Sequence, residues 1–195
     1  MTMHDSGDHL GRDPWRGPHR PLPAAAGAGI ATGTATRPGD HVPLPALPVA
    51  AGWARRRGGE ILRGWELSAD TVETVSLIVS ELVTNALQHG VGRAAGPDAA
   101  ARCAQCGSQV CMTLKDEPDG ILIEVFDSST VPPLPAADPY APALYGEFDD
   151  GLDDFALGSE RGRGLTIVAN LSEEQGYYLP PGGGKIVWCA VKPEV

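Results

Sequence analysis

The sequence has no long hydrophobic run and few positive charges, and each absence excludes a class of protein. No stretch of about 18 apolar residues occurs, so we expect no membrane span. The segment 24–31 is rich in Ala and Gly, lacks Leu, Val and Phe, and begins far from Met1; we interpret it as low-complexity sequence rather than a signal peptide and expect a cytoplasmic protein. The 15 Lys and Arg residues face 25 acidic residues, for a net charge of −10. This balance argues against direct binding to nucleic acid and favours a protein partner.

Cysteine is also scarce, with 4 residues in 195. In a reducing cytoplasm we do not expect these to form disulfides. Cys103 and Cys106 have the C-x-x-C spacing of half a zinc site, and Cys111 follows closely. However, no second C-x-x-C occurs, and the nearest histidine, His89, lies on a different predicted element. We therefore expect a pair of loop thiols and two thiols packed on strands, Cys111 and Cys189, with zinc binding as the alternative.

Glycine and proline, at 25 and 18 residues, are abundant. Residues 1–47 contain 7 of the prolines and show no apolar periodicity. Such a segment buries too little surface to offset the entropy of ordering it, so we predict a disordered tail. Residues 48–195 are long enough for one domain with a hydrophobic core.

The most regular apolar pattern lies between Ser68 and Gly90 and predicts a helix. Ser68 or Asp70 suits its N-cap, and Gly90 suits the left-handed position that ends helices. A shorter helix is predicted before it, over residues 49–64. The buried stripe of the longer helix is predicted to consist of Val72, Val75, Val79, Leu82, Val83 and Ala86.

Downstream, strands are separated by a long loop and a third helix. The predicted elements are strands 110–114 and 121–126, a loop over 130–160, a helix that opens at Gly162-Arg163-Gly164, and a hairpin of 176–179 and 185–191. The order of helices and strands predicts an α+β fold. Its architecture is a two-layer sandwich with helices packed on one face of a mixed or antiparallel sheet.

Three polar residues of the longer helix, Glu81, Asn85 and Gln88, share one sector at about 100° per residue. A polar sector opposite a buried stripe is ordinarily exposed to solvent. Here Leu77 and Ile78 flank the sector, which favours the wall of a pocket. An Asn oxygen suits Mg²⁺, and a glutamate one turn away can accept a proton. This pair fits phosphoryl transfer, in which positioning and charge neutralisation supply most of the catalysis.

Two further segments fit a nucleotide site. Asp127 ends an apolar strand, where its carboxylate can accept a hydrogen bond from the adenine amino group. The alternative for Asp127 is an Asx cap that starts a turn before Ser128. Gly162-Arg163-Gly164 opens a helix whose N-terminal amides can bind phosphate, although glycines also serve as simple hinges.

Together these segments resemble the three sequence boxes of the GHKL (Bergerat-fold, histidine-kinase-like) ATPases. The boxes are Glu81-x-x-x-Asn85-Ala86-x-x-His89-Gly90, Asp127 after a strand, and Gly162-Arg163-Gly164-Leu165. The sequence is most similar to the anti-sigma-factor serine kinase branch, whose members are small single domains. Residues 80–86 resemble the helix of that branch, and residues 183–188 resemble its terminal hairpin. The resemblance covers about residues 48–195.

The resemblance implies a Bergerat fold that binds ATP and Mg²⁺. Asn85 would bind Mg²⁺, Glu81 would be the general base, and Asp127 would bind adenine. Residues 130–160 would form the ATP lid. The residues against the phosphates would be Gly162, Arg163, Gly164 and Leu165.

The resemblance also implies protein partners. Members of the branch phosphorylate a serine on an anti-sigma-antagonist protein and otherwise sequester a sigma factor; they often dimerise, so a homodimer is implied as well.

One segment departs from the pattern: Ser128–Pro133 stands where the family usually has glycines. This departure favours an alternative function, a regulatory module that binds ATP or a protein without catalysis. A further alternative is a histidine kinase. The last lacks support because no helix pair with a phosphoacceptor histidine precedes residue 48.

Overall fold

The structure is a computed structural model that describes residues 39–91, 101–133 and 163–193. Most of the predicted tail, most of the predicted lid and Gly162 lie outside the described residues. The predictions for these segments therefore remain predictions.

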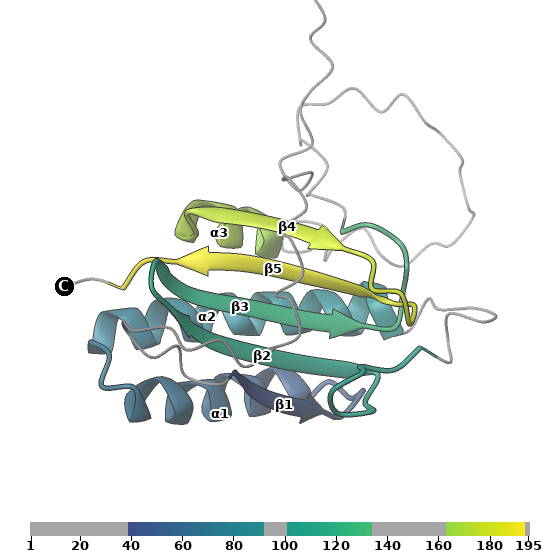
Figure 1. Cartoon of the computed structure of the whole chain (residues 1–195), viewed down its shortest axis with the longest axis horizontal. Coiled ribbons are helices and arrows are strands. Elements are labelled where there is room, and N and C mark those ends of the chain that lie inside the picture. The colour runs from purple at the N-terminus through teal and green to yellow at the C-terminus, as the bar shows by residue number, and fades with distance from the viewer. Residues whose placement is uncertain (1–38, 92–100, 134–162, 194–195) are drawn as a thin grey trace, which may run out of the picture.

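A five-stranded antiparallel sheet forms one layer of the fold (Figure 1). Its strands run in the order β1-β2-β3-β5-β4, and each neighbouring pair is antiparallel. The strands are β1 (Asp40–Leu44), β2 (Val110–Glu117), β3 (Gly120–Asp127), β4 (Glu174–Tyr178) and β5 (Lys185–Val191). Of the two sheet types predicted, the antiparallel one is present.

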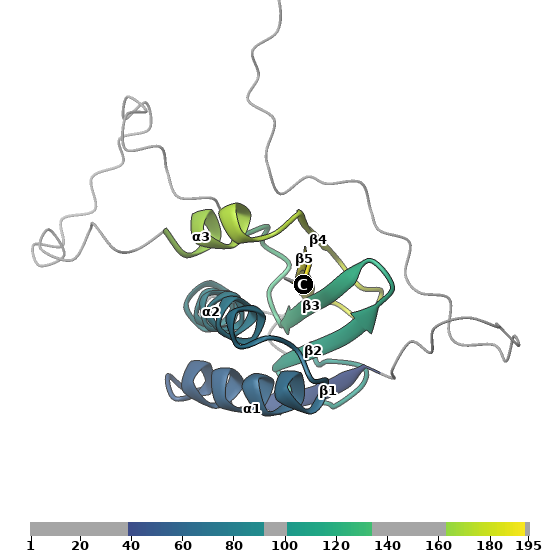
Figure 2. The same cartoon turned by 90° about the vertical axis from the view of Figure 1, so that its left-hand side faces the viewer.

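Three α-helices, α1 (Ala50–Gly64), α2 (Ala69–Asn85) and α3 (Arg163–Leu171), cover one face of the sheet (Figure 2). Because strand side chains alternate between faces, every second residue of β3 enters the core that α2 also lines. The predicted α+β fold with helices on one face is confirmed. None of the helices that the structure describes is long and apolar enough to cross a membrane.

Helix α2 begins where the sequence predicts. Ser68 is its N-cap, and the Ser68 Oγ accepts a hydrogen bond from the Thr71 N–H at 3.2 Å. The predicted stripe is buried except for Val72, which is half-buried. Ile78, which the sequence predicts to flank a pocket, is fully buried in the core, whereas Leu77 is 41 % exposed.

The end of this helix differs from the prediction. After Asn85 the chain continues as a π-helical segment, η1 (Ala86–Val91), so Gly90 lies inside a helix. Gly90 does not have the predicted left-handed conformation, because its φ is not positive. Glycine is needed there for a different reason: a Cβ on residue 90 would collide with the carboxyl group of Asp127. The wide turn thus brings the end of the helix against the end of β3.

Strand β1 corrects the boundary of the predicted disordered tail. Residues 40–44 lie within 1–47 but pair with β2, about 70 positions away in the chain, and Leu44 is buried in the core. Pro43 obscured this strand, since proline is unfavourable inside a sheet. An edge strand tolerates it because one side of the backbone needs no partner.

Candidate functional site

Glu81 and Asn85 lie one turn apart on α2, and both are half-buried. Glu81 is close to the first turn of α3. A Cβ on Gly164 would lie only 2.5 Å from the Glu81 Oε2, so glycine is what allows α3 to approach the carboxylate. The unpaired amides at the start of a helix carry partial positive charge, which attracts a carboxylate. The structure therefore brings the first and third of the sequence boxes together.

Asp127, the last residue of β3, is fully buried and lies against Gly90 of η1. Its Oδ1 accepts a hydrogen bond from the Lys185 Nζ at 2.8 Å and another from the Ser129 N–H at 2.9 Å. The bond from Ser129 is the turn that the sequence left open as an alternative role for Asp127. The Oδ1 is thus engaged by the fold itself.

The second oxygen of this carboxylate, Oδ2, differs from Oδ1 in its hydrogen bonding. Among the described residues, neither the Asp127 Oδ2 nor the neighbouring Ser128 Oγ has a hydrogen-bond partner, although both are buried. A buried polar atom without a partner costs free energy, so such atoms are rare in proteins, and a bound ligand is one explanation for them. The backbone of Gly90 lies directly against the same carboxyl group. The Oδ2 is therefore an acceptor for which the described protein supplies no donor.

Lys185 pairs with Asp127, although the sequence pattern places it only in the terminal hairpin. It is only 1 % exposed and lies opposite Asp127 in the pairing of β3 with β5. Burial raises the pKa of the Asp127 carboxyl above its ordinary value, and the Lys185 ammonium and the Ser129 amide offset only part of this rise. The signal in the sequence was a lysine at the head of an otherwise apolar strand.

The turn before Lys185 depends on glycine. Gly183 and Gly184 have φ values of 82° and 75°, a region that other residues rarely adopt. A Cβ on Gly184 would also lie 2.5 Å from the Asp127 carbonyl oxygen and 2.7 Å from the ring of Phe126. These glycines let the hairpin fold closely over the end of β3 and carry Lys185 to Asp127.

Gln88 does not share the surroundings of Glu81 and Asn85. Because the helix widens after Asn85, Gln88 is exposed and lines a cavity of about 390 Å³ with Thr84 and residues 46–48. Neither Glu81 nor Asn85 lines this cavity. The prediction that all three polar residues form one wall is wrong for Gln88, since it assumed a regular α-helical turn.

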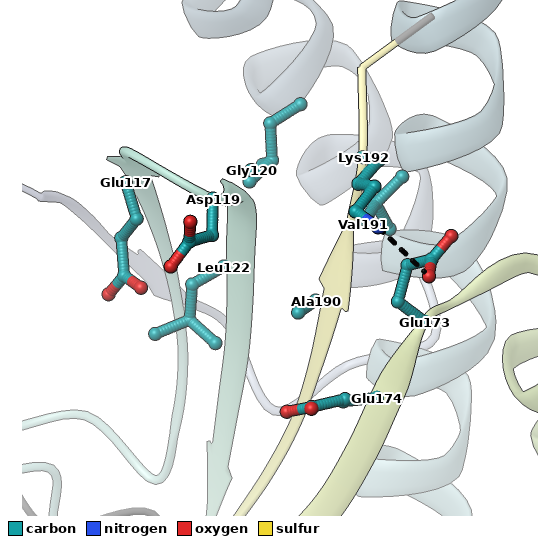
Figure 3. A pocket seen from close by; sticks show the side chains of 10 residues that line it. Glu117, Asp119, Gly120, Leu122, Glu173, Glu174, Ala190, Val191 and Lys192 are labelled. Carbon is teal, nitrogen blue, oxygen red and sulfur yellow. Dashed lines mark hydrogen bonds and ion pairs between the residues drawn. The ribbon is translucent and has the colours of Figure 1, made fainter.

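A second cavity, of about 510 Å³, lies at the opposite end of the sheet (Figure 3). Glu117 and Asp119 line it from the β2–β3 turn, and Glu173 and Glu174 line it from the start of β4. The Lys192 Nζ pairs with Glu173 at 3.4 Å. Four carboxylates at short range repel a polyphosphate, so this cavity does not suit one.

Comparisons with known proteins identify the family and support the fold. A family model described as the histidine kinase-like ATPase domain matches residues 44–190. The matched region contains Glu81, Asn85, Asp127, Gly164 and Lys185. A search of curated proteins gives no match.

Among solved structures, the chain is similar to the crystal structure of the RsbU and RsbW domains of a protein from Mycobacterium tuberculosis. The TM-score is 0.50 at 17 % sequence identity, and the match covers 80 % of this chain and 32 % of that chain. This likeness supports the fold. The chain spans only 32 % of the length of that relative. Since the family model matches well over half of the sequence, the chain belongs to the histidine kinase-like ATPase domain family.

Proposed function

We propose that the chain is an ATP-dependent protein serine/threonine kinase of the anti-sigma-factor type. It would phosphorylate a serine on an anti-sigma-antagonist protein and, when not so engaged, sequester a sigma factor. The observation that carries the proposal is the position of the Glu81 carboxylate, one turn from Asn85 and against the first turn of α3 at Gly164. The fold likeness to a structure that contains an RsbW domain supports a regulatory role.

The residues of the site fit ATP and Mg²⁺. The buried Asp127 Oδ2 needs a donor, and the adenine amino group is one. The Asn85 side-chain oxygen is a suitable Mg²⁺ ligand. The backbone amides at the start of α3, at Gly162, Arg163, Gly164 and Leu165, would face the phosphates. Bound ATP would supply the phosphoryl group, and Mg²⁺ would offset its charge.

Glu81 has the role of general base in this proposal. Its carboxylate would take the proton from the hydroxyl of the partner serine as that oxygen attacks. The positive end of α3 attracts the carboxylate and so helps to position it. Glu81 is half-buried in the described part of the chain, and in this proposal its exposed part would face the partner serine.

A second candidate function is a regulatory module that binds ATP without transferring phosphate. The observation in its favour is the segment after Asp127. Ser128 and Ser129 are buried where the family usually has glycines, and the Asp127 Oδ1 is held by Lys185. These features leave the base, Glu81, in place but change the floor of the nucleotide site.

One experiment separates the two functions. The full-length protein is incubated with Mg²⁺, γ-labelled ATP and a candidate antagonist protein, and phosphoserine is measured; ATP binding is followed in parallel by calorimetry. Phosphoserine on the antagonist supports the kinase. Binding of ATP with no transfer to any antagonist supports the binding module, and the absence of ATP binding contradicts both.

Asn85→Ala is expected to abolish Mg²⁺-dependent ATP binding, with an affinity at least about 100-fold lower, because the metal loses its side-chain ligand. Calorimetry with and without Mg²⁺ measures the effect. The matched control is Gln88→Ala, which removes an exposed amide from the adjoining segment η1 and should bind as the wild type does. An unchanged affinity of Asn85→Ala for Mg²⁺–ATP would refute the assignment of the metal ligand.

Gly164→Ala is expected to slow phosphate transfer by about 10–100-fold, since small displacements of a catalytic group are costly. The added Cβ would lie 2.5 Å from the Glu81 Oε2 and must displace this carboxylate, while the flexible side chain spares the fold. Gly182→Ala is the matched control, because its Cβ would meet nothing within 4 Å. Equal transfer rates for the two variants would show that the closeness of α3 to Glu81 is unimportant.

A further inference from the structure

The cysteines of residues 101–111 lie on the face of the sheet that the helices do not cover. Cys111 on β2, Phe126 on β3 and Ile186 on β5 are neighbours across the strands. Cys111 and Phe126 form a small core of their own with Ala101 and Cys103, separate from the main core. The residues that alternate with them, such as Met112 and Val125, enter the main core beneath the helices.

Three sulfur atoms converge in this small core. The Sγ atoms of Cys103, Cys106 and Cys111 all lie within 4.8 Å of one another. Cys103 and Cys111 are buried, and Cys106 is half-buried, so the group is shielded but open on one side. All three are free thiols. The sequence alone placed Cys106 in a loop and Cys111 on a strand; it is the fold that joins them.

The loop that carries the first two cysteines is a tight turn. The Gly107 N–H donates to the Cys103 carbonyl oxygen at 2.8 Å, and the Cys103 N–H donates to the Ser108 carbonyl oxygen at 2.9 Å. Gly107 has a φ of 70°, which favours glycine. A turn of this kind presents the side chains of Cys103 and Cys106 to the same point, as a C-x-x-C metal site requires.

We propose that Cys103, Cys106 and Cys111 bind one zinc ion through three thiolates, with a solvent molecule at the fourth position. Thiolates favour zinc over Mg²⁺, so this site is distinct in chemistry from the one at Asn85. With Zn–S bonds of about 2.3 Å, tetrahedral geometry puts the sulfurs about 3.8 Å apart. The sulfurs therefore need to move by no more than about 1 Å from their present separations.

Zinc binding would displace the protons of the three thiols. Each of the three thiols loses one proton, and three sulfur–zinc bonds form with no change in oxidation state. At present the Cys103 Sγ donates a hydrogen bond to the Gln105 Oε1 at 3.0 Å. Gln105 is exposed and can turn to solvent, so this contact is replaced easily.

From the position of the cluster, bound zinc would stabilise the end of β3. The cluster covers Phe126, the residue before Asp127, from the side opposite the helices. A Cβ on Gly183 would lie 3.4 Å from the Ala101 Cβ, so the same loop also touches the hairpin that carries Lys185. Zinc would tie the loop to the start of β2 and support the strand ends behind Asp127 and Lys185.

The test measures zinc in the full-length protein purified under reducing conditions. Elemental analysis is expected to find one zinc per chain in the wild type, and Co²⁺ in its place should give a thiolate-to-metal charge-transfer band. Cys103→Ser and Cys106→Ser are expected to bind zinc at least about 100-fold more weakly in competition with a chelator. Cys189→Ala is the matched control, because that thiol lies in the main core on the helix side.

Circular dichroism establishes that each variant is folded, and Cys106→Ser is the safest of them because Cys106 is the least buried of the three. The proposal is overturned if the reduced wild type neither retains zinc nor gives the cobalt band. It is also overturned if folded Cys103→Ser and Cys106→Ser hold zinc as tightly as Cys189→Ala does. None of these outcomes depends on whether the chain binds ATP.

Discussion

Glu81→Gln is expected to leave ATP binding intact and to slow phosphate transfer to a partner serine by about 10²–10⁴-fold, the usual contribution of a general base. Glutamine keeps the size and most of the contacts of the side chain but cannot take the proton of the serine hydroxyl. The fold should survive, because Glu81 is half-buried and lies at the edge of the contact with α3. Initial rates of phosphoserine formation measure the effect, with calorimetry for ATP binding.

The control for this variant is Glu73→Gln, which makes the same chemical change at an exposed position on the same helix. It should transfer phosphate at the wild-type rate. Transfer at the wild-type rate by Glu81→Gln would eliminate Glu81 as the base while leaving the ATP site in place. Loss of ATP binding in this variant would instead assign Glu81 to the nucleotide or its metal.

Lys185→Met is expected to lower the free energy of unfolding by about 3–5 kcal/mol, as is usual when one partner of a buried ion pair is removed. The two side chains are 1 % and 0 % exposed, and their charged atoms are 2.8 Å apart. Without the ammonium, the Asp127 carboxylate remains buried, and the Ser129 amide is its one remaining partner among the residues that the structure describes. Denaturation by guanidinium at pH 7 measures the loss.

Two further variants check the cause. The double variant Asp127→Asn/Lys185→Met removes both charges and should recover most of the stability. Lys192→Met removes an exposed lysine, 3.4 Å from Glu173, and should cost no more than about 1 kcal/mol. If Lys185→Met is no less stable than Lys192→Met, the buried pair contributes nothing to the fold.

The loss of unfolding free energy in Lys185→Met should also depend on pH. Burial already raises the pKa of Asp127, and loss of the ammonium raises it further. A carboxyl with a raised folded pKa destabilises the protein as pH rises from about 4, the unfolded value, to the folded value. Below about 4 the carboxyl is protonated in both states, so the difference from the wild type should shrink there.

Much of the fold could be predicted because it depends on local patterns. The periodicity of α2, its Ser68 cap and the hairpin of β4 and β5 all rest on residues close together in the chain. Strand β1 could not be predicted this way. It has only five residues, contains Pro43, and is stabilised by β2, a partner far along the chain.

In the candidate site, too, the residues that are close in the sequence could be predicted, and the contacts between distant residues could not. Glu81 and Asn85 are four positions apart on one helix, so their common face follows from helical geometry. The contact of Lys185 with Asp127 could not be predicted, because it spans 58 positions and depends on the register of β3 and β5. The reason for a glycine at Gly90 was likewise hidden, since the atoms it makes room for belong to Asp127.

The sequence by itself determined the helices, most strands, and the motifs that identify the family, because backbone hydrogen bonding and side-chain periodicity act over a few residues. The tertiary structure alone decided which of these residues meet. It engages one oxygen of Asp127 with Lys185 and leaves the other without a partner in the described residues. It also gathers three thiols from a loop and a strand into one cluster. Burial and charge pairing set these properties, and both depend on contacts between distant parts of the chain.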